Sequence, residues 1–136
     1  GVAKNQKSHH PVNLVDLFPT IFDLAGVKHH DQEDGKSLIN LLDDDSSTSI
    51  GMDYAYHQYK RGKKMGYAIR TKRYRYTEWH DNNYRSYDDY TTSKISGREL
   101  YDYKTDPLET KNLIKDPAYK ATVKLLKAKM KSHLSK

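Results

Sequence analysis

Apolar residues recur at helical spacing near both ends of the chain. The first stripe comprises Leu14, Leu17, Phe18, Ile21 and Leu24. Asp16 is a suitable N-cap and Gly26 a suitable stop, so we predict a short, buried helix over residues 14–25. The second stripe comprises Tyr119, Val123, Leu126, Met130 and Leu134. It follows Asp116-Pro117, a typical helix start, and predicts a longer helix over residues 117–133 with a lysine-rich outer face.

Between these helices, aromatic residues alternate with polar ones in the manner of β-strands. The predicted strands span residues 52–59, 66–71, 73–79 and 99–103. We expect a tight hairpin with Thr71-Lys72 as its link between the second and third strands. A run of strands flanked by helices indicates an α+β fold. We therefore expect a roughly four-stranded antiparallel sheet, packed by the long C-terminal helix and the short N-terminal helix.

The composition is poor in aliphatic residues and rich in tyrosine. Leu, Ile, Val and Phe make up only about 18% of the 136 residues, a share at which disorder becomes an option. The 12 tyrosines and one tryptophan favour order, because tyrosine buries a large ring while its hydroxyl stays hydrated. No apolar run of about 18 residues is present, so we expect no membrane span. The sequence has no cysteine, which excludes disulfides, thiolate nucleophiles and cysteine-ligated zinc.

Several motifs resemble metal-binding sites but have a simpler structural interpretation. His9-His10 and His29-His30 are adjacent pairs whose side chains diverge, so neither forms a natural metal clamp. Residues 43–45 are three aspartates, but they lack the alternating ligands, turn glycine and distant glutamate of a calcium loop. We expect surface histidines and a solvated loop, with no metal site.

Basic residues interleave with aromatic ones around the predicted hairpin. Arg70, Lys72, Arg73 and Arg75 stand among Tyr74, Tyr76 and Trp79. This pattern suits a platform for single-stranded nucleic acid, and it equally suits a thin sheet with tyrosines inside and arginine stems outside. The lysines of the last helix could face an acidic membrane or, more commonly, solvent. We favour the structural interpretation in both cases.

A short segment at the end of the first strand has binding potential. His57, Gln58 and Arg61 stand close together, and such groups recognise a sulfate, a carboxylate or a sugar hydroxyl. The alternative is an edge strand that runs into a basic loop. No nucleophile with a matched base is evident, so we predict no catalytic residue in this chain.

Four segments, in order along the chain, together resemble the C-terminal part of sulfatases. They are Leu14–Thr20 with Asp23–Gly26; Asp34–Leu38 with Leu41-Leu42; Met65–Thr71 with Tyr74–Trp79; and Glu99–Tyr103 with Asp106–Glu109 and Asn112-Leu113. The third is similar to the hairpin of the iduronate-2-sulfatase branch of the alkaline-phosphatase-like superfamily. The resemblance extends over nearly the whole chain.

This resemblance implies a parent enzyme that hydrolyses sulfate esters with a formylglycine and a divalent cation, usually calcium. The formylglycine comes from a Cys/Ser-x-Pro-x-Arg motif, which is absent here. We therefore expect residues 1–49 to pack on an N-terminal catalytic part and residues 50–136 to form the C-terminal subdomain. The chain alone should lack activity and expose an apolar patch, with poor solubility or a non-native dimer as the result.

The resemblance also bears on the segment Ala55–Arg61, which is similar to a Ser-Gln-Tyr-Pro-Arg stretch of that branch. Gln58, Tyr59 and Arg61 match, whereas His57 and Lys60 replace the serine and the proline. It implies that His57, Gln58 and Arg61 border the pocket for a sulfated saccharide, such as a glycosaminoglycan, in a secreted or periplasmic enzyme. No nucleic acid or membrane partner is then expected.

The formal charge of +6 leaves one alternative of another class. A non-catalytic module that binds polyanions or nucleic acid would use Arg70, Arg73, Arg75 and the final helix. Its binding would weaken steeply as the salt concentration rises.

Overall fold

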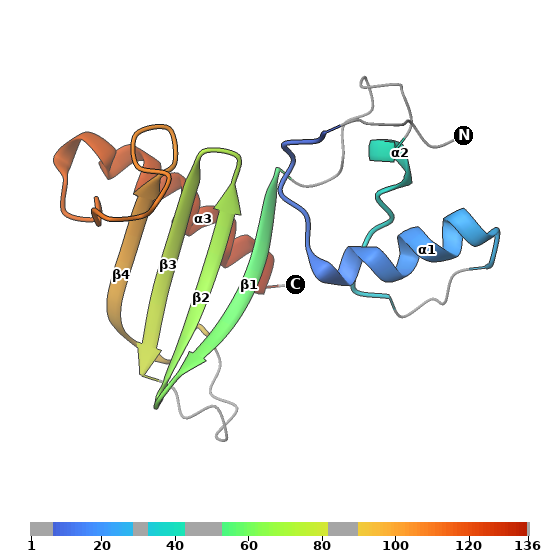
Figure 1. Ribbon diagram of the computed structural model, residues 1–136. Helices are drawn as coiled ribbons and strands as arrows, with labels where there is room; N and C mark the ends of the chain where they lie inside the picture. The colour runs from blue at the N-terminus through green and yellow to red at the C-terminus, as the bar shows by residue number, and fades with distance from the viewer. Residues whose placement is uncertain (1–6, 29–32, 43–52, 82–89, 136) are drawn as a thin grey trace. The chain divides into compact units, whose positions relative to one another are not determined.

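The computed structural model describes residues 7–28, 33–42, 53–81 and 90–135. The chain divides into two compact units, residues 1–55 and 56–136. The predicted α+β fold is confirmed (Figure 1). The predicted aspartate loop over residues 43–45 and the pair at residues 29–30 lie outside the described residues.

The first unit contains a 3₁₀ turn η1 (Leu14–Asp16), helix α1 (Leu17–Ala25) and the single turn α2 (Ile39–Leu42). The helical segment expected over residues 14–25 is therefore present. It ends where expected, because Gly26 takes the left-handed conformation with φ of 65°.

The burial predicted for this helix is wrong, because the apolar stripe lies on its exposed side. Leu14 is 85% exposed and Ile21 60%, whereas Asp16, Pro19 and Thr20 are buried. Asp16 stands at the N-cap position, but its carboxylate instead accepts hydrogen bonds from the amides of Asn13 (2.9 Å) and Lys36 (3.0 Å). The spacing of apolar residues shows that a helix has an apolar face, but not that the chain itself covers that face.

The second unit is built on a sheet with the strand order β1-β2-β3-β4. The strands are β1 (Tyr54–Arg61), β2 (Lys64–Thr71), β3 (Tyr74–Asp81) and β4 (Lys94–Asp102). The β2–β3 and β3–β4 pairs are antiparallel. The hairpin link is Lys72-Arg73 rather than Thr71-Lys72, and β4 begins earlier than expected. The early part of β4 is polar and contains Gly97, so pairing with β3 overrides its weak strand propensity.

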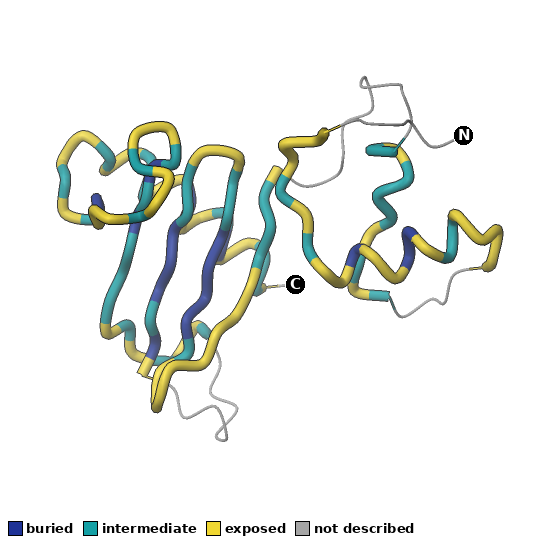
Figure 2. The backbone as a smooth tube through the Cα atoms, viewed as in Figure 1, coloured by how far each residue is buried: buried dark blue, intermediate teal, exposed yellow. Residues whose placement is uncertain are grey.

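One face of the sheet packs against α3 (Lys120–Leu134), which follows the 3₁₀ turn η2 (Pro117–Tyr119). The side chain of Asp116 caps this turn by accepting a hydrogen bond from the amide of Ala118 at 2.9 Å. Figure 2 shows the buried stretches in β2 and β3. The most deeply buried apolar residues of this core include Ile69, Tyr76, Leu100, Leu126 and Met130. None of the described helices is both long and apolar enough to cross a membrane.

Part of the outer edge of β4 is covered by residues 112–113. The Asn112 side-chain oxygen accepts hydrogen bonds from the amides of Leu100 (3.0 Å) and Ile114 (3.1 Å). Its amide group donates to the carbonyl of Arg98 at 3.1 Å, and the amide of Leu113 donates to the carbonyl of Leu100 at 2.8 Å. The closing Asn-Leu motif therefore caps a sheet edge.

Candidate functional site: a hollow on the open face of the sheet

Successive side chains of a strand point to opposite faces, so the residues between the core positions form a second face. This face, turned away from the core, carries a hollow of about 750 Å³. Its lining residues are His57, Gln58, Tyr59, Arg61, Gly66, Ala68, Arg75, Thr77, Trp79, Glu99 and Tyr101. All three predicted binding residues thus border the hollow, but only His57 and Arg61 share its face of β1, whereas the Gln58 side chain lies on the α3 side with Tyr56.

The floor of the hollow is made of small, buried residues. Gly66, Ala68 and Thr77 lie on the two central strands. A Cβ atom on Gly66 would lie 2.8 Å from Cζ3 of Trp79, so the indole packs directly on the backbone of β2. The indole Nε1 donates a hydrogen bond to Glu99 at 2.8 Å. The absence of large side chains on the floor leaves the space, and Trp79 forms one wall.

The β1 side of the hollow carries the predicted residues. Arg61 is exposed and has no carboxylate partner among the described residues. Loss of solvent around the ring of His57, together with the nearby Arg75 guanidinium, lowers the pKa of His57. The amide of Gln58 donates to the hydroxyl of Tyr56 at 2.7 Å. Arg61 can therefore receive an anion, and a neutral His57 can hydrogen-bond a hydroxyl group, while the Gln58 amide is already engaged.

Arg75 forms the opposite part of the lining and is held by residues of the closing motif. It forms an ion pair with Glu109, whose other carboxylate oxygen accepts a hydrogen bond from Tyr103. Glu109 adopts a left-handed backbone conformation, with φ of 56°. Within the described part of the chain, Arg75 Nε and Thr77 Oγ1 are buried without a hydrogen-bond partner. The lining of the hollow therefore contains an N–H group and a hydroxyl group that a ligand could hydrogen-bond.

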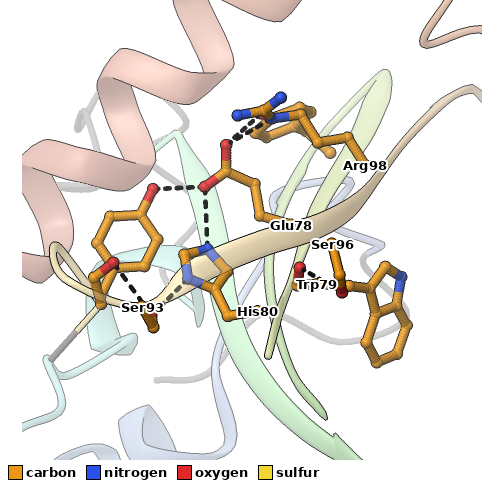
Figure 3. Close-up of polar contacts among 8 residues, drawn as sticks. Glu78, Trp79, His80, Ser93, Ser96 and Arg98 are labelled. Atoms are coloured by element: carbon orange, nitrogen blue, oxygen red, sulfur yellow. Dashed lines mark hydrogen bonds and ion pairs between the residues drawn. The ribbon is translucent and has the colours of Figure 1, made fainter. Parts of the chain in front are cut away.

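The most elaborate polar cluster lies on the opposite, core-facing side of the sheet (Figure 3). Glu78 and His80 are fully buried there. The Glu78 carboxylate accepts hydrogen bonds from Tyr76 (2.6 Å), Tyr90 (2.7 Å) and Arg98 (3.1 Å), and its Oε2 lies 3.3 Å from His80 Nε2. Burial alone would raise the pKa of Glu78, but these hydrogen bonds outweigh it and lower that pKa.

Sequence reasoning missed this cluster, although strand alternation could have found part of it. Residues 76, 78 and 80 share one face, and Tyr76 was expected to point inward. The predicted strand ended at residue 79, which left His80 in a loop. Figure 3 shows the Trp79 indole pointing away from Glu78 and His80. The cluster therefore supports the sheet from the core and does not line the hollow.

The basic residues considered for nucleic-acid binding are used within the fold. Arg73 pairs with the buried Asp102 through two hydrogen bonds of 2.9 and 2.7 Å. The Arg70 guanidinium lies 3.5 Å from the ring centre of Tyr103. Arg75 is paired with Glu109, as described above. These contacts leave less charge available for a polyanion than the sequence suggested.

The cofactors implied by the resemblance find no ligands in the described residues. No group of three or more His, Asp or Glu side chains among them could hold a metal ion. The sequence contains no Cys/Ser-x-Pro-x-Arg motif as a source of formylglycine. The donor set of these residues therefore does not fit either group.

Comparison with known families decides the relationship. All of residues 1–136 match the model of the family described as N-sulphoglucosamine sulphohydrolase, C-terminal. The chain belongs to this sulfatase C-terminal family. The sulfatase C-terminal domain is 34% identical over 108 residues to a Delta 4,5-hexuronate-2-O-sulfatase of Bacteroides thetaiotaomicron, covering 77% of the chain and 20% of that relative. It is 25% identical over 128 residues to a sulfatase of Formosa agariphila, covering 94% of the chain and 22% of that relative.

Solved structures agree with this assignment. A putative sulfatase from Bacteroides thetaiotaomicron superposes with a TM-score of 0.68 at 30% identity, over 88% of this chain and 24% of that one. A second structure was solved in complex with its substrate, D-glucosamine-2-N,6-O-disulfate. It gives a TM-score of 0.65 at 27% identity, over 87% of this chain and 23% of that one. The domain thus corresponds to about a fifth of the length of the curated relatives it matches.

Proposed function

We propose that this domain belongs to a sulfuric ester hydrolase and that its hollow borders the binding site for a sulfated saccharide. The observation that carries the proposal is that His57 and Arg61 share one face of a hollow in a sulfatase C-terminal domain, with Gln58 also at its border. Two relatives support the substrate class, because one is named a hexuronate-2-O-sulfatase and another was solved with a sulfated glucosamine as its substrate.

The chemistry of the rim suits such a ligand. The Arg61 guanidinium, which has no carboxylate partner among the described residues, offers a planar fork to a sulfate or a uronate carboxylate. A neutral imidazole beside it can donate to or accept from a sugar hydroxyl. We further propose that the parent enzyme has the substrate specificity of an iduronate-2-sulfatase-like enzyme. It would act on glycosaminoglycans and be secreted or periplasmic.

The reaction centre is assigned to a partner, namely an N-terminal catalytic part of the same sulfatase. That part would supply the formylglycine and the calcium site, for which the described residues offer no ligand set. The exposed apolar face of α1 supports an interface with this catalytic part, since exposed contiguous apolar surfaces commonly mark interaction sites. On this proposal, the domain shapes the site without catalysing the reaction alone.

The test is a titration of the 136-residue chain with D-glucosamine-2-N,6-O-disulfate, followed by NMR chemical shifts. Arg61→Ala should weaken binding about tenfold, because it removes a charge-assisted contact. Lys72→Ala is the matched control: it removes one positive charge from an exposed residue that does not line the hollow, and affinity should stay within about twofold.

Unsulfated glucosamine should bind much more weakly than the disulfate. The proposal is wrong if the sulfated sugar does not bind, or if Arg61→Ala and Lys72→Ala weaken binding equally. Equal effects would indicate a response to net charge rather than a site.

A further inference from the structure

A second, smaller hollow adjoins the first on the same sheet. It measures about 430 Å³ and is lined by Arg61, Lys63, Lys64, Trp79 and Glu99. Arg61, Trp79 and Glu99 line both hollows, so these residues form a shared wall. We propose that the two hollows are adjacent sugar subsites for an anionic oligosaccharide, with the Trp79 indole as the stacking platform between them. This inference deepens the proposed function and rests on it.

The indole is built as a flat, fixed surface. A Cβ on Gly66 would lie 2.8 to 3.1 Å from Cζ3, Cε3 and Cη2, so the six-membered ring lies over β2. A Cβ on Gly97 would lie 3.7 Å from Cδ1, so the other end of the indole approaches β4. The indole thus reaches across the sheet from one neighbouring strand to the other, with a glycine near each end. An apolar ring held in this way presents a flat area to the apolar face of a sugar ring.

A hydrogen bond holds the ring in this orientation. Nε1 donates to Glu99 at 2.8 Å across the β3–β4 pair. Trp79 nevertheless remains partly exposed, so a ligand can reach it. Its position is therefore established before binding, which lowers the entropic cost of forming a stacked contact.

The charges around the second hollow define the ligand class. Three of its five lining residues are cations, and Lys64 forms a long ion pair with Asp81 at 3.7 Å, with both side chains about half exposed. Exposed ion pairs are weak and easily exchanged for another anion. Cations beside an aromatic platform are complementary to a saccharide that bears sulfate or carboxylate groups on more than one sugar ring. A neutral glycan would leave this charge unmatched.

The experiment exploits the fact that Trp79 is the only tryptophan in the chain. A heparin-derived tetrasaccharide is titrated into the 136-residue chain and followed by tryptophan fluorescence, beside the glucosamine disulfate titration. We expect a saturable fluorescence change and about tenfold tighter binding of the tetrasaccharide than of the monosaccharide. The same tetrasaccharide after chemical desulfation should lose that gain.

Two glycine variants provide the matched test. Gly66→Ala places a methyl group within 2.8 Å of the indole and must displace it, whereas Gly97→Ala makes only an ordinary contact at 3.7 Å. Because Gly66 and Trp79 also line the first hollow, the readout is the ratio of the two affinities: Gly66→Ala should bring the tetrasaccharide-to-monosaccharide ratio from about ten to about one. Gly97→Ala should keep that ratio. If Gly66→Ala does not fold by circular dichroism, Trp79→Leu measured by calorimetry serves instead, with the same expected loss.

The outcomes separate the two proposals. If the monosaccharide binds but the tetrasaccharide gains nothing, or if its gain survives both Gly66→Ala and Trp79→Leu, the second subsite is refuted and the proposed function stands. If neither saccharide binds, the proposed function fails and the subsite with it. If single-stranded DNA binds more tightly than the tetrasaccharide and loses that affinity in Gly66→Ala, the platform serves nucleic acid and the saccharide assignment is overturned.

Discussion

Replacing Glu78 by glutamine tests whether the buried carboxylate cluster stabilises the sheet. The variant keeps the size of the side chain and removes its charge. Arg98 Nε can only donate, so the amide oxygen must take the place of Oε1, where Tyr76 also donates. The amide nitrogen then faces the Tyr90 hydroxyl and His80 Nε2, both of which can accept a hydrogen bond in another orientation or tautomer.

The expected cost of Glu78→Gln follows from this arrangement. All four contacts can persist with an uncharged side chain in place of the carboxylate. The loss is therefore the difference between hydrogen bonds to a charged and to a neutral group, and it includes the ion pair with Arg98, which stays positively charged. The side chain of Arg98 is 37% exposed, which moderates its share. We expect the free energy of unfolding at neutral pH to fall by about 2 kcal/mol.

The assay is urea unfolding of the wild type and the variant, followed by circular dichroism and Trp79 fluorescence at neutral and acidic pH. The pKa of Glu78 lies below its ordinary value of 4.5 in the folded protein. Its carboxylate therefore contributes stability above that value, and the contribution is lost as the pH falls through the lower, folded pKa. The difference between wild type and variant should accordingly shrink in acid.

Glu99→Gln is the matched control, because Glu99 lies on the neighbouring strand and the opposite face. Its side-chain oxygen can still accept the hydrogen bond from Trp79, so stability should change by less than about 0.5 kcal/mol. A Glu78→Gln variant as stable as the wild type, or a difference that does not shrink in acid, would refute this account.

Four further outcomes are expected. Gly35→Ala would place a Cβ 2.1 Å from the carbonyl oxygen of Val15, so the amides of Lys36 and Leu38 should lose protection in hydrogen exchange; unchanged protection would contradict the close approach. Phe18→Asp should reduce self-association in sedimentation experiments, because Phe18 is 51% exposed on the apolar face of α1, whereas Lys28→Asp should not. The 136-residue chain should not hydrolyse an aryl sulfate above background, and clear turnover would show that its own residues suffice. Single-stranded DNA should bind weakly even at low salt, since Arg70, Arg73 and Arg75 are engaged within the fold; tight, salt-sensitive binding would restore the polyanion hypothesis.

The fold could be predicted from the sequence wherever the spacing of apolar residues alone determines which face of a helix or strand is buried. The alternation of Tyr74 and Tyr76 with Arg75 and Thr77 assigns each residue to one face of a strand, and the structure has those faces. The stripe ending in Leu126 and Met130 likewise identified the packed side of α3. Both patterns are local, so no knowledge of distant contacts was needed.

The features that were missed depend on distant residues. A glutamate in a strand normally faces solvent, and Glu78 is buried only because donors arrive from residues 76, 80, 90 and 98. The hollow depends on Gly66 and Ala68, which in a sequence look like weak strand formers rather than the floor of a site. The exposure of α1 could not be read from its periodicity, because an apolar stripe does not identify the surface that covers it.

The two outer edges of the sheet differ in how well they can pair with a further strand. The Asn112 side chain and the Leu113 amide already bind the backbone of β4 at Arg98 and Leu100, so no further strand can pair at these positions. In the part of the chain that the structure describes, β1 has a strand partner on one side only. An edge of this kind is where a sheet accepts another strand, within one protein or between proteins. A strand added beside β1 would run along His57 and Arg61, so the same edge that permits the sheet to be extended would bring new backbone to the rim of the hollow.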